Sequence, residues 1–175
     1  GACVGSADES REAGTVTLEQ LIDAYAPAVR RYLYRRLTGA PDPAATADEL
    51  TADVFVIAWR RREDVPEGAE LPWLYAVARR VLANYRRRPQ EVLIADLGEL
   101  DAIDESDPAD IVTDDAELAA AWRSLSPRDR EVLRLVAWEG LKAVELGAAL
   151  GISEGGAAAA LSRARARLVD ALAST

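Results

Sequence analysis

The sequence predicts an all-α protein of two small helical domains, an N-terminal helical bundle and a C-terminal helix-turn-helix, joined by a flexible acidic linker. Two observations predict this organisation. Apolar residues recur at helical intervals in two blocks of the chain. Between the blocks, the chain carries eleven acids, no base and no lasting helical period, which is typical of a disordered linker. We therefore divide it into a flexible leader (1–16), a first domain (17–88), the linker (89–117) and a second domain (118–175).

Composition excludes several classes of function. The net charge is −9, but the linker alone contributes −11, and residues 18–88 and 118–175 each carry +2, so a nucleic-acid partner stays possible. With no histidine, and with Cys3 as the only cysteine, little remains for catalysis or metal binding. We predict no enzymatic activity, no catalytic residue, no metal and no cofactor. The longest apolar runs are too short to span a membrane and no signal peptide is evident, so we expect a cytoplasmic protein without membrane contact of its own.

The first helix is expected to open at a capping box formed by Thr17 and Gln20. Pro27 falls inside its helical period and is expected to bend the helix or restart it. Four arginines are expected to leave a basic outer face: Arg30, Arg31, Arg35 and Arg36.

A second capping box, Thr46 with Glu49, predicts a helix to about Arg62. Its core stripe is Leu50, Val54, Ile57 and Ala58. Acids gather near its N-terminus at Asp48, Glu49 and Asp53. They could simply complement the helix dipole, or they could form a docking patch for a basic partner.

A third helix is predicted from Pro72 to about Arg88. Arg80, Asn84 and Arg87 share one face, and aromatic residues interleave with the arginines: Trp73, Tyr75 and Tyr85. Guanidinium groups neutralise phosphates and aromatic rings stack on unpaired bases, so this pattern suits nucleic acid. A solvated basic face above core aromatics fits equally well.

The second domain has the parts of a helix-turn-helix. Ser126, Pro127 and Asp129 predict a capped helix start, and Gly140 can end that helix in a left-handed conformation. The next helix is expected to bury three residues, followed by a tight turn and a capped last helix: Val144, Leu146 and Leu150, then Gly151 and Ser153. An ordinary helical hairpin on a bundle is the alternative.

The last helix presents few groups for reading bases. It ends in basic residues at Arg163, Arg165 and Arg167, but its start, Gly156–Ala160, is small and apolar. Base edges are normally read by long polar side chains near the start of such a helix.

Two blocks of the chain resemble bacterial RNA polymerase sigma factors. Residues 48–60, 72–80 and 84–88 resemble the second conserved region of these proteins. Residues 125–133, 151–155 and 161–168 are similar to the fourth region. Two regions without an intervening domain resemble the extracytoplasmic-function (ECF) group of the sigma-70 family. The small Gly156–Ala160 segment departs from the family, which usually places a lysine or arginine there.

The resemblance implies a transcription initiation factor that binds core RNA polymerase, directs it to the −10 and −35 promoter elements and assists strand opening. It implies core polymerase contacts at Asp48, Glu49, Thr51, Asp53 and Phe55. It implies −10 contacts, with the Glu63–Leu71 loop, at Arg79, Arg80, Asn84, Arg87 and Arg88, and −35 contacts at Arg128, Ser153, Glu154, Arg163 and Arg165. Core RNA polymerase, promoter DNA and an anti-sigma factor are the implied partners, and the acidic linker would thread toward the polymerase active-site cleft.

Two other functions stay open from the residues alone. A helix-turn-helix transcriptional regulator acting without polymerase would normally dimerise on a two-fold site. A helical adaptor that binds only proteins is the third alternative, favoured by the alanine-rich last helix.

Overall fold

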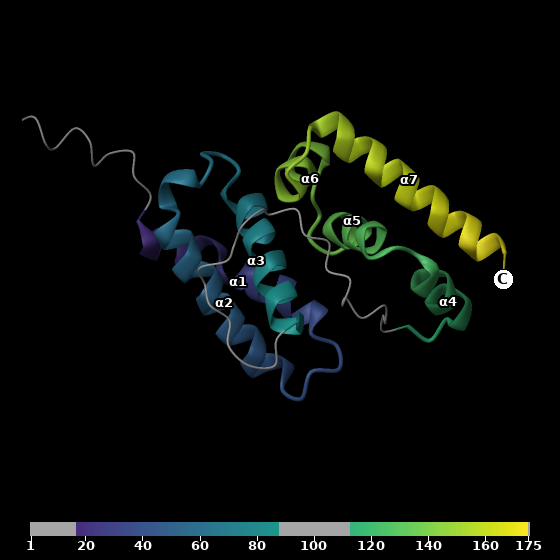
Figure 1. Ribbon diagram of the computed structural model, residues 1–175, viewed down its shortest axis with the longest axis horizontal. Helices are drawn as coiled ribbons and strands as arrows, with labels where there is room; N and C mark the ends of the chain where they lie inside the picture. The colour runs from purple at the N-terminus through teal and green to yellow at the C-terminus, as the bar shows by residue number, and fades with distance from the viewer. Residues whose placement is uncertain (1–16, 88–112, 175) are drawn as a thin grey trace, which may run out of the picture.

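The computed structural model describes residues 17–87 and 113–174 (Figure 1). Within these ranges the regular structure is helical, as predicted, with seven α-helices, one short 3-10 helix and no strand. The predicted leader, most of the predicted linker and Arg88 lie outside the described residues.

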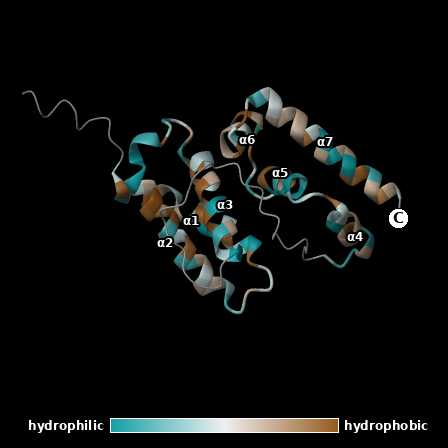
Figure 2. Ribbon diagram, viewed as in Figure 1, coloured by the Kyte–Doolittle hydropathy of each residue, from teal (hydrophilic) through white to brown (hydrophobic). Residues whose placement is uncertain are grey.

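Three helices form the first domain, on the left of Figure 1: α1 (Leu18–Arg36), α2 (Pro43–Arg60) and α3 (Glu70–Arg87). A 3-10 turn (Arg62–Asp64) and a short loop join α2 to α3. Each helix packs on the other two. Hydrophobic residues alternate with hydrophilic ones along the helices (Figure 2), and the hydrophobic ones fill a common core around Val29, Val54 and Leu74.

The helix starts confirm one predicted cap and correct another. Thr17 and Gln20 form the expected capping box, with Thr17 Oγ1 accepting from the Gln20 amide at 3.2 Å. Helix α2, however, begins three residues before Thr46, because Asp42 caps it by accepting from the Ala45 amide and a proline occupies the first position. Thr46 therefore lies inside the helix. The predicted core stripe of α2 is buried as expected.

Helix α1 continues through Pro27 without restarting there, and Leu21 and Val29, on either side of the proline, are both buried. Another prediction for α1 is corrected. Arg36 does not belong to an outer basic face, because it is 3% exposed and its guanidinium forms ion pairs with the second domain.

The second domain contains α4 (Ala116–Ser124), α5 (Pro127–Ala137), α6 (Ala143–Leu150) and α7 (Glu154–Ala173). Asp115 caps α4, so this helix starts slightly before the predicted domain boundary. Helix α7 packs on α4, α5 and α6, and α6 also packs on α3 of the first domain (Figure 1). Leu146 and Leu150 are buried as predicted. Val144 is 61% exposed, contrary to expectation, because it lies on the side of α6 opposite Leu146.

The predicted caps at Ser126 and Ser153 are both present, and Gly140 and Gly151 have positive φ angles of 69° and 70°. The side chain of Asp129 does not help to cap the helix as predicted. Its amide donates to Ser126 Oγ, but its carboxylate does not reach back to the helix start. Both oxygens instead accept from Arg167 Nη1, at 2.9 and 2.8 Å. This pair ties the start of α5 to α7.

Candidate nucleic-acid and protein interfaces

Helix α2 presents an acidic surface. Asp48, Glu49 and Asp53 are exposed, and Asp48 forms an ion pair with Arg30 at 2.6 Å. Partial burial, and then the negative charge of Glu49, raise the pKa of Asp53. Two neighbouring carboxylates that repel each other would be stabilised by a cationic partner. Thr51 adds less to this acidic surface, because its hydroxyl donates to the Ala47 carbonyl within the helix at 2.6 Å.

Phe55 does not join this surface. It is 5% exposed and belongs to the core, because α2 uses that side to pack on its neighbours. A contact of Phe55 with core polymerase stays a prediction. Val56 and Trp59 are exposed instead, at 42% and 44%, and the Arg62 guanidinium lies 4.4 Å from the Trp59 ring centre. These two side chains add exposed apolar area beside the acids, which the helical period alone did not reveal.

Helix α3 carries the arginine-rich face. Arg79, Arg80 and Asn84 are partly exposed and Arg87 is exposed, all within the last turns of one helix. Arg86 donates to the Arg36 carbonyl at 2.5 Å, which ties the end of α3 to the end of α1. The structure thus brings together four of the five residues predicted for the −10 contact.

The aromatic residues of α3 support this face from within. Trp73 and Tyr75 are 8% and 4% exposed, and the Tyr75 ring stacks on Tyr32 with ring centres 5.2 Å apart. Burial on this scale makes both residues core rather than platforms for bases. Tyr85 is half-buried beside the basic face.

Helices α6 and α7 form the helix-turn-helix. Three residues separate them, with Gly151 in a left-handed conformation and Ser153 Oγ accepting from the Gly156 amide at 3.0 Å. The helices approach closely: a Cβ atom added at Gly147 would lie 2.8 Å from the Ile152 carbonyl oxygen. The turn therefore fixes the direction of α7 relative to α6.

The exposed face of α7 is small in side-chain volume. Ala157, Ala160 and Ala164 are buried against the domain, so Gly155, Ala159, Ser162 and Ala166 point outward. Arg163 and Arg165 are separated by about 160° around the helix and flank this face on opposite sides. Ser153 and Glu154 are exposed at its start, and Arg128 is exposed at the start of α5. Four of the predicted −35 residues, on or next to α7, thus border a surface of small side chains.

A groove of about 740 Å³ lies beside Arg165. It is mostly apolar and opens between the end of α1 and three helices of the second domain. Its lining includes Tyr34, Leu37, Trp122, Leu133 and Leu168, and two further cations, Arg35 and Arg134.

The two domains contact each other through a buried polar network that the sequence analysis did not identify. Arg36 Nε donates to Glu131 at 3.1 Å, and Arg36 Nη2 donates to Glu139 at 2.9 Å. The Tyr32 hydroxyl donates to Glu131 at 2.7 Å. These partners are 95 to 103 residues apart in the chain, so no local sequence signal could have found them.

The charged groups in this network stabilise one another's ionised forms. Burial opposes the ionised form of Glu131, but the Arg36 guanidinium and the hydrogen bond from Tyr32 outweigh it and lower the Glu131 pKa. Burial and then the nearby Glu131 charge raise the pKa of Tyr32 well above its ordinary value. Arg36 is also opposed by burial, yet Glu131 and its other neighbours raise its pKa. The network therefore consists of a cation, two acids and a neutral phenol.

Within residues 17–87 and 113–174, no three acidic, cysteine or histidine side chains gather in a way that could hold a metal ion. None of the helices in these ranges combines the length and hydropathy needed to cross a membrane.

Comparison with known proteins agrees with this architecture. A family model described as Sigma-70 region 2 matches residues 21–91, and one described as Sigma-70, region 4 matches residues 115–168. The chain is 34% identical over 143 residues to the ECF RNA polymerase sigma factor BldN of Streptomyces coelicolor, covering 78% of this chain and 53% of that protein. It is 32% identical over 146 residues to the ECF RNA polymerase sigma factor SigF of Caulobacter vibrioides, covering 81% and 78%.

Among solved structures, the fold is similar to the sigma factor RpoE in complex with the anti-sigma factor NepR from Bartonella quintana. The TM-score is 0.53 at 22% identity, over 88% of this chain and 95% of that one. The two helical domains, in this order, define a two-region protein of the sigma type. The chain belongs to the ECF group of the sigma-70 family. It spans only about half the length of some relatives, 53% of BldN and 34% of the probable sigma factor RfaY of Xanthomonas campestris.

Proposed function

We propose that this protein is a transcription initiation factor that binds core RNA polymerase, directs it to promoters and assists strand opening. The observation that carries the proposal is the pairing, on one chain, of a basic helix in the first domain with a helix-turn-helix in the second. A regulator acting alone would need only the helix-turn-helix. No catalytic role is proposed for any residue, and the site of action is the cytoplasm, where the polymerase works on DNA.

The polymerase would contact the exposed side of α2. Asp53 and Glu49 supply negative charge, and Val56 and Trp59 supply apolar area beside them. Charge steers association and apolar burial provides affinity, so a basic surface with an apolar pocket is the complementary partner.

The −10 element would be captured on α3 and the −35 element on α7. Arg79, Arg80, Asn84 and Arg87 offer guanidinium and amide groups to a melted strand. The α7 face offers backbone, methyl and hydroxyl groups with Arg163 at its edge, which favours readout of DNA shape and of thymine methyl groups over long polar contacts. Binding to duplex promoter without polymerase should therefore be weak.

An anti-sigma factor is the proposed antagonist. Its candidate docking site is the groove beside Arg165, whose apolar lining and three arginines fit an amphipathic helix with acidic flanks.

Transcription in vitro with added core polymerase tests the function. The full chain should yield a promoter-dependent transcript, and the Asn84→Ala, Arg87→Ala double variant should lose most of it. Arg31→Ala, at an exposed arginine of α1, serves as the matched control and should retain activity. If the chain only reduced transcription driven by another initiation factor, it would be a regulator and the proposal would be wrong.

A further inference from the structure

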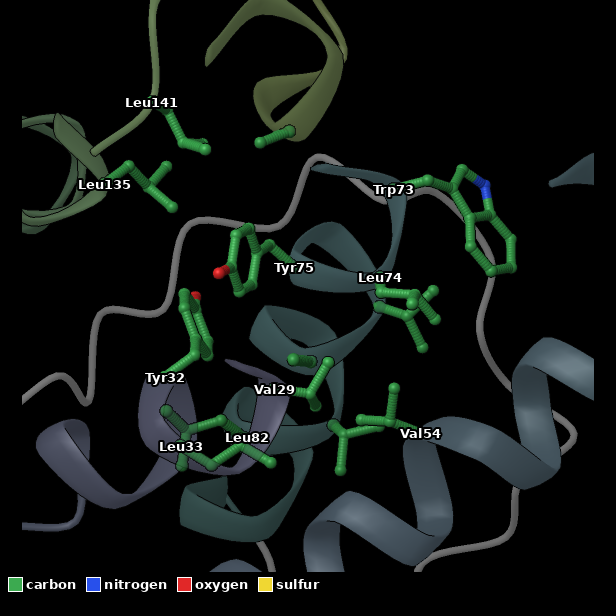
Figure 3. Packing of buried hydrophobic residues seen from close by; sticks show 14 of the residues in the cluster. Val29, Tyr32, Leu33, Val54, Trp73, Leu74, Tyr75, Leu82, Leu135 and Leu141 are labelled. Atoms are coloured by element: carbon green, nitrogen blue, oxygen red, sulfur yellow. The ribbon is translucent and has the colours of Figure 1, made fainter. Parts of the chain in front are cut away.

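The loop between α2 and α3, residues 61–69, continues the basic face of α3. Trp73 lies about two helical turns before Arg80, so both residues lie on the same side of α3. Figure 3 shows the Trp73 and Tyr75 rings on opposite sides of this helix. The Arg61 guanidinium lies 6.0 Å from the Trp73 ring centre, which places the start of the loop on the side that carries Arg80. A single strand that follows the arginines toward the start of α3 therefore meets this loop.

Local bonds and the core fix the first half of the loop. The Asp64 amide donates to the Arg61 carbonyl at 2.8 Å, and Arg61 Nε forms an ion pair with Asp64 Oδ2 at 3.1 Å. Val65 is partly buried and packs against the hydrophobic core. The conformation of this half is therefore set by its own residues and by the core beneath it.

Glu70 fastens the second half of the loop. The Gly68 amide donates to Glu70 Oε1 at 2.9 Å, and the Ala69 amide donates to the Pro66 carbonyl at 3.2 Å. Gly68 has a φ angle of 81°, which glycine adopts at little cost. Because Glu70 is the first residue of α3, its bond to Gly68 joins the exposed tip of the loop to the start of that helix. A hydrogen bond to a carboxylate is stronger than one between neutral groups.

Tyr25 connects Glu70 to a second helix. Partial burial, the charge of Glu70 and a hydrogen bond to Glu70 raise the pKa of Tyr25. Tyr25 itself packs against the hydrophobic core from α1. A carboxylate can accept several hydrogen bonds, so Glu70 serves both the Gly68 amide and the Tyr25 hydroxyl. The tip of the loop is thus tied to α3 and, through Glu70, to α1.

The charge of Glu70 makes these bonds informative. A carboxylate near a nucleic-acid strand repels the phosphates, so electrostatics alone would make Glu70 unfavourable for binding. The bonds to Gly68 and Tyr25 give it an opposite effect. A loop that is already held in its bound shape loses less conformational entropy when it binds.

We propose that Glu70 is a positioning residue, which together with Tyr25 holds the loop in the shape that binds the melted −10 strand. The proposal rests on the proposed function and adds to it the group that orders the loop. Without Glu70 the loop would adopt its binding shape for only a fraction of the time, and the apparent Kd would rise by the inverse of that fraction.

Four variants of the full chain test the proposal. Glu70→Ala removes both bonds, Glu70→Gln keeps an oxygen that can accept them, and Tyr25→Phe removes only the hydroxyl. Asp23→Ala removes one negative charge from an exposed position of α1 and is the matched control for charge. Each variant is combined with core polymerase, and Kd is measured for a promoter fragment that yields transcript in the assay above. The fragment carries mismatches across its −10 region, so that the strands there are already unpaired. Amide exchange of Gly68 in the free chain is followed by NMR.

Positioning and electrostatics predict changes of opposite sign. Glu70→Ala should raise Kd about 10-fold although it removes a negative charge, because the loop is then seldom in its binding shape. Glu70→Gln should stay within about 2-fold of the parent, and Tyr25→Phe should fall between the two. Asp23→Ala should leave Kd unchanged or lower it slightly. Gly68 amide exchange should become about 10-fold faster in Glu70→Ala and change little in Glu70→Gln.

Two results would overturn the positioning role. One is a Kd for Glu70→Ala that equals or falls below that of the parent. The other is unchanged Gly68 exchange in Glu70→Ala. Circular dichroism confirms that each variant is folded, and Tyr25→Phe supplies the comparison if Glu70→Ala does not fold. If the parent chain formed no promoter-binding complex with polymerase, the proposed function would be refuted, and a binding role for Glu70 with it. The Gly68 exchange would still show whether Glu70 holds the loop.

Discussion

A single methyl group at Gly147 should destabilise the helix-turn-helix. A Cβ atom there would lie 2.8 Å from the Ile152 carbonyl oxygen and 3.2 Å from the Ser153 carbonyl carbon and oxygen. All three are backbone atoms of the turn between α6 and α7, so they cannot rotate away as a side chain could. Gly147→Ala must therefore shift the turn or move α6 away from α7.

The expected change in the free energy of unfolding follows from two opposing effects. Replacing glycine by alanine inside a helix gains about 1 kcal/mol, because glycine loses more backbone entropy on folding. Overpacking a close contact costs about 1–3 kcal/mol. Gly155 provides the matched control, because it lies in exposed α7 and an added Cβ would meet nothing within 4 Å. Gly155→Ala should thus show the gain alone, and the two variants should differ by about 1–3 kcal/mol in free energy of unfolding.

Urea and thermal unfolding followed by circular dichroism measure this difference. For a domain of this size, 1 kcal/mol corresponds to about 4–8 °C in Tm. We expect Gly155→Ala to raise the Tm of the protein or leave it unchanged. We expect Gly147→Ala to melt at least about 4 °C below Gly155→Ala. Equal stabilisation by both substitutions would refute the reasoning, since it would mean that the turn has free space beside Gly147.

Three further predictions concern the surfaces and the contact between the two domains. Glu49→Lys with Asp53→Lys should weaken binding to core polymerase by about 10-fold or more through charge repulsion, whereas Glu117→Lys on α4 should not, as measured by competition with a labelled initiation factor. Arg163→Gln should reduce the salt dependence of promoter binding by the holoenzyme by about one unit of log–log slope. Arg167→Gln should instead lower Tm through loss of its bond to Asp129, with little change in that slope. The contact between the domains should depend on pH through Glu131, which faces Arg36 and Tyr32 from α1 and Arg134 on its own helix. Because this contact lowers the Glu131 pKa, its contribution to the free energy of unfolding is present above the ordinary carboxylate value of about 4.3 and is lost as pH falls through the lowered one. The raised Tyr32 pKa acts oppositely, and its contribution is lost as pH rises above about 10. The free energy of unfolding should therefore fall at both extremes of pH, and the acidic fall should be smaller in Glu131→Gln. An equally steep acidic fall in that variant would contradict the role of Glu131.

Local patterns predicted much of the fold. The Thr17–Gln20 capping box, the Ser126 and Ser153 caps and the left-handed glycines at 140 and 151 are all present. Each depends on residues within a few positions of one another, so the sequence contains the whole signal. The predicted start of α2 was wrong because two capping signals, Asp42 and Thr46, lie close together. The helix uses Asp42, which is followed by a proline.

Contacts between distant segments were beyond sequence reasoning. Arg36 has the same local pattern as the exposed arginines of α1, and only the approach of α5 makes it a buried ion-pair partner. Phe55 and Trp59 likewise differ only in the side of α2 on which they lie. Polar or apolar character indicates whether a residue can be buried. The neighbouring element decides whether it is.

The bond between Asp129 and Arg167 has a mechanical consequence. It fastens the first turn of α5 to the C-terminal half of α7, while the next residues of α5 carry Glu131. These two helices are then coupled, so a displacement of α7 also moves the start of α5. Within one helical turn that displacement reaches Glu131, the carboxylate that contacts Arg36 and Tyr32 of the first domain.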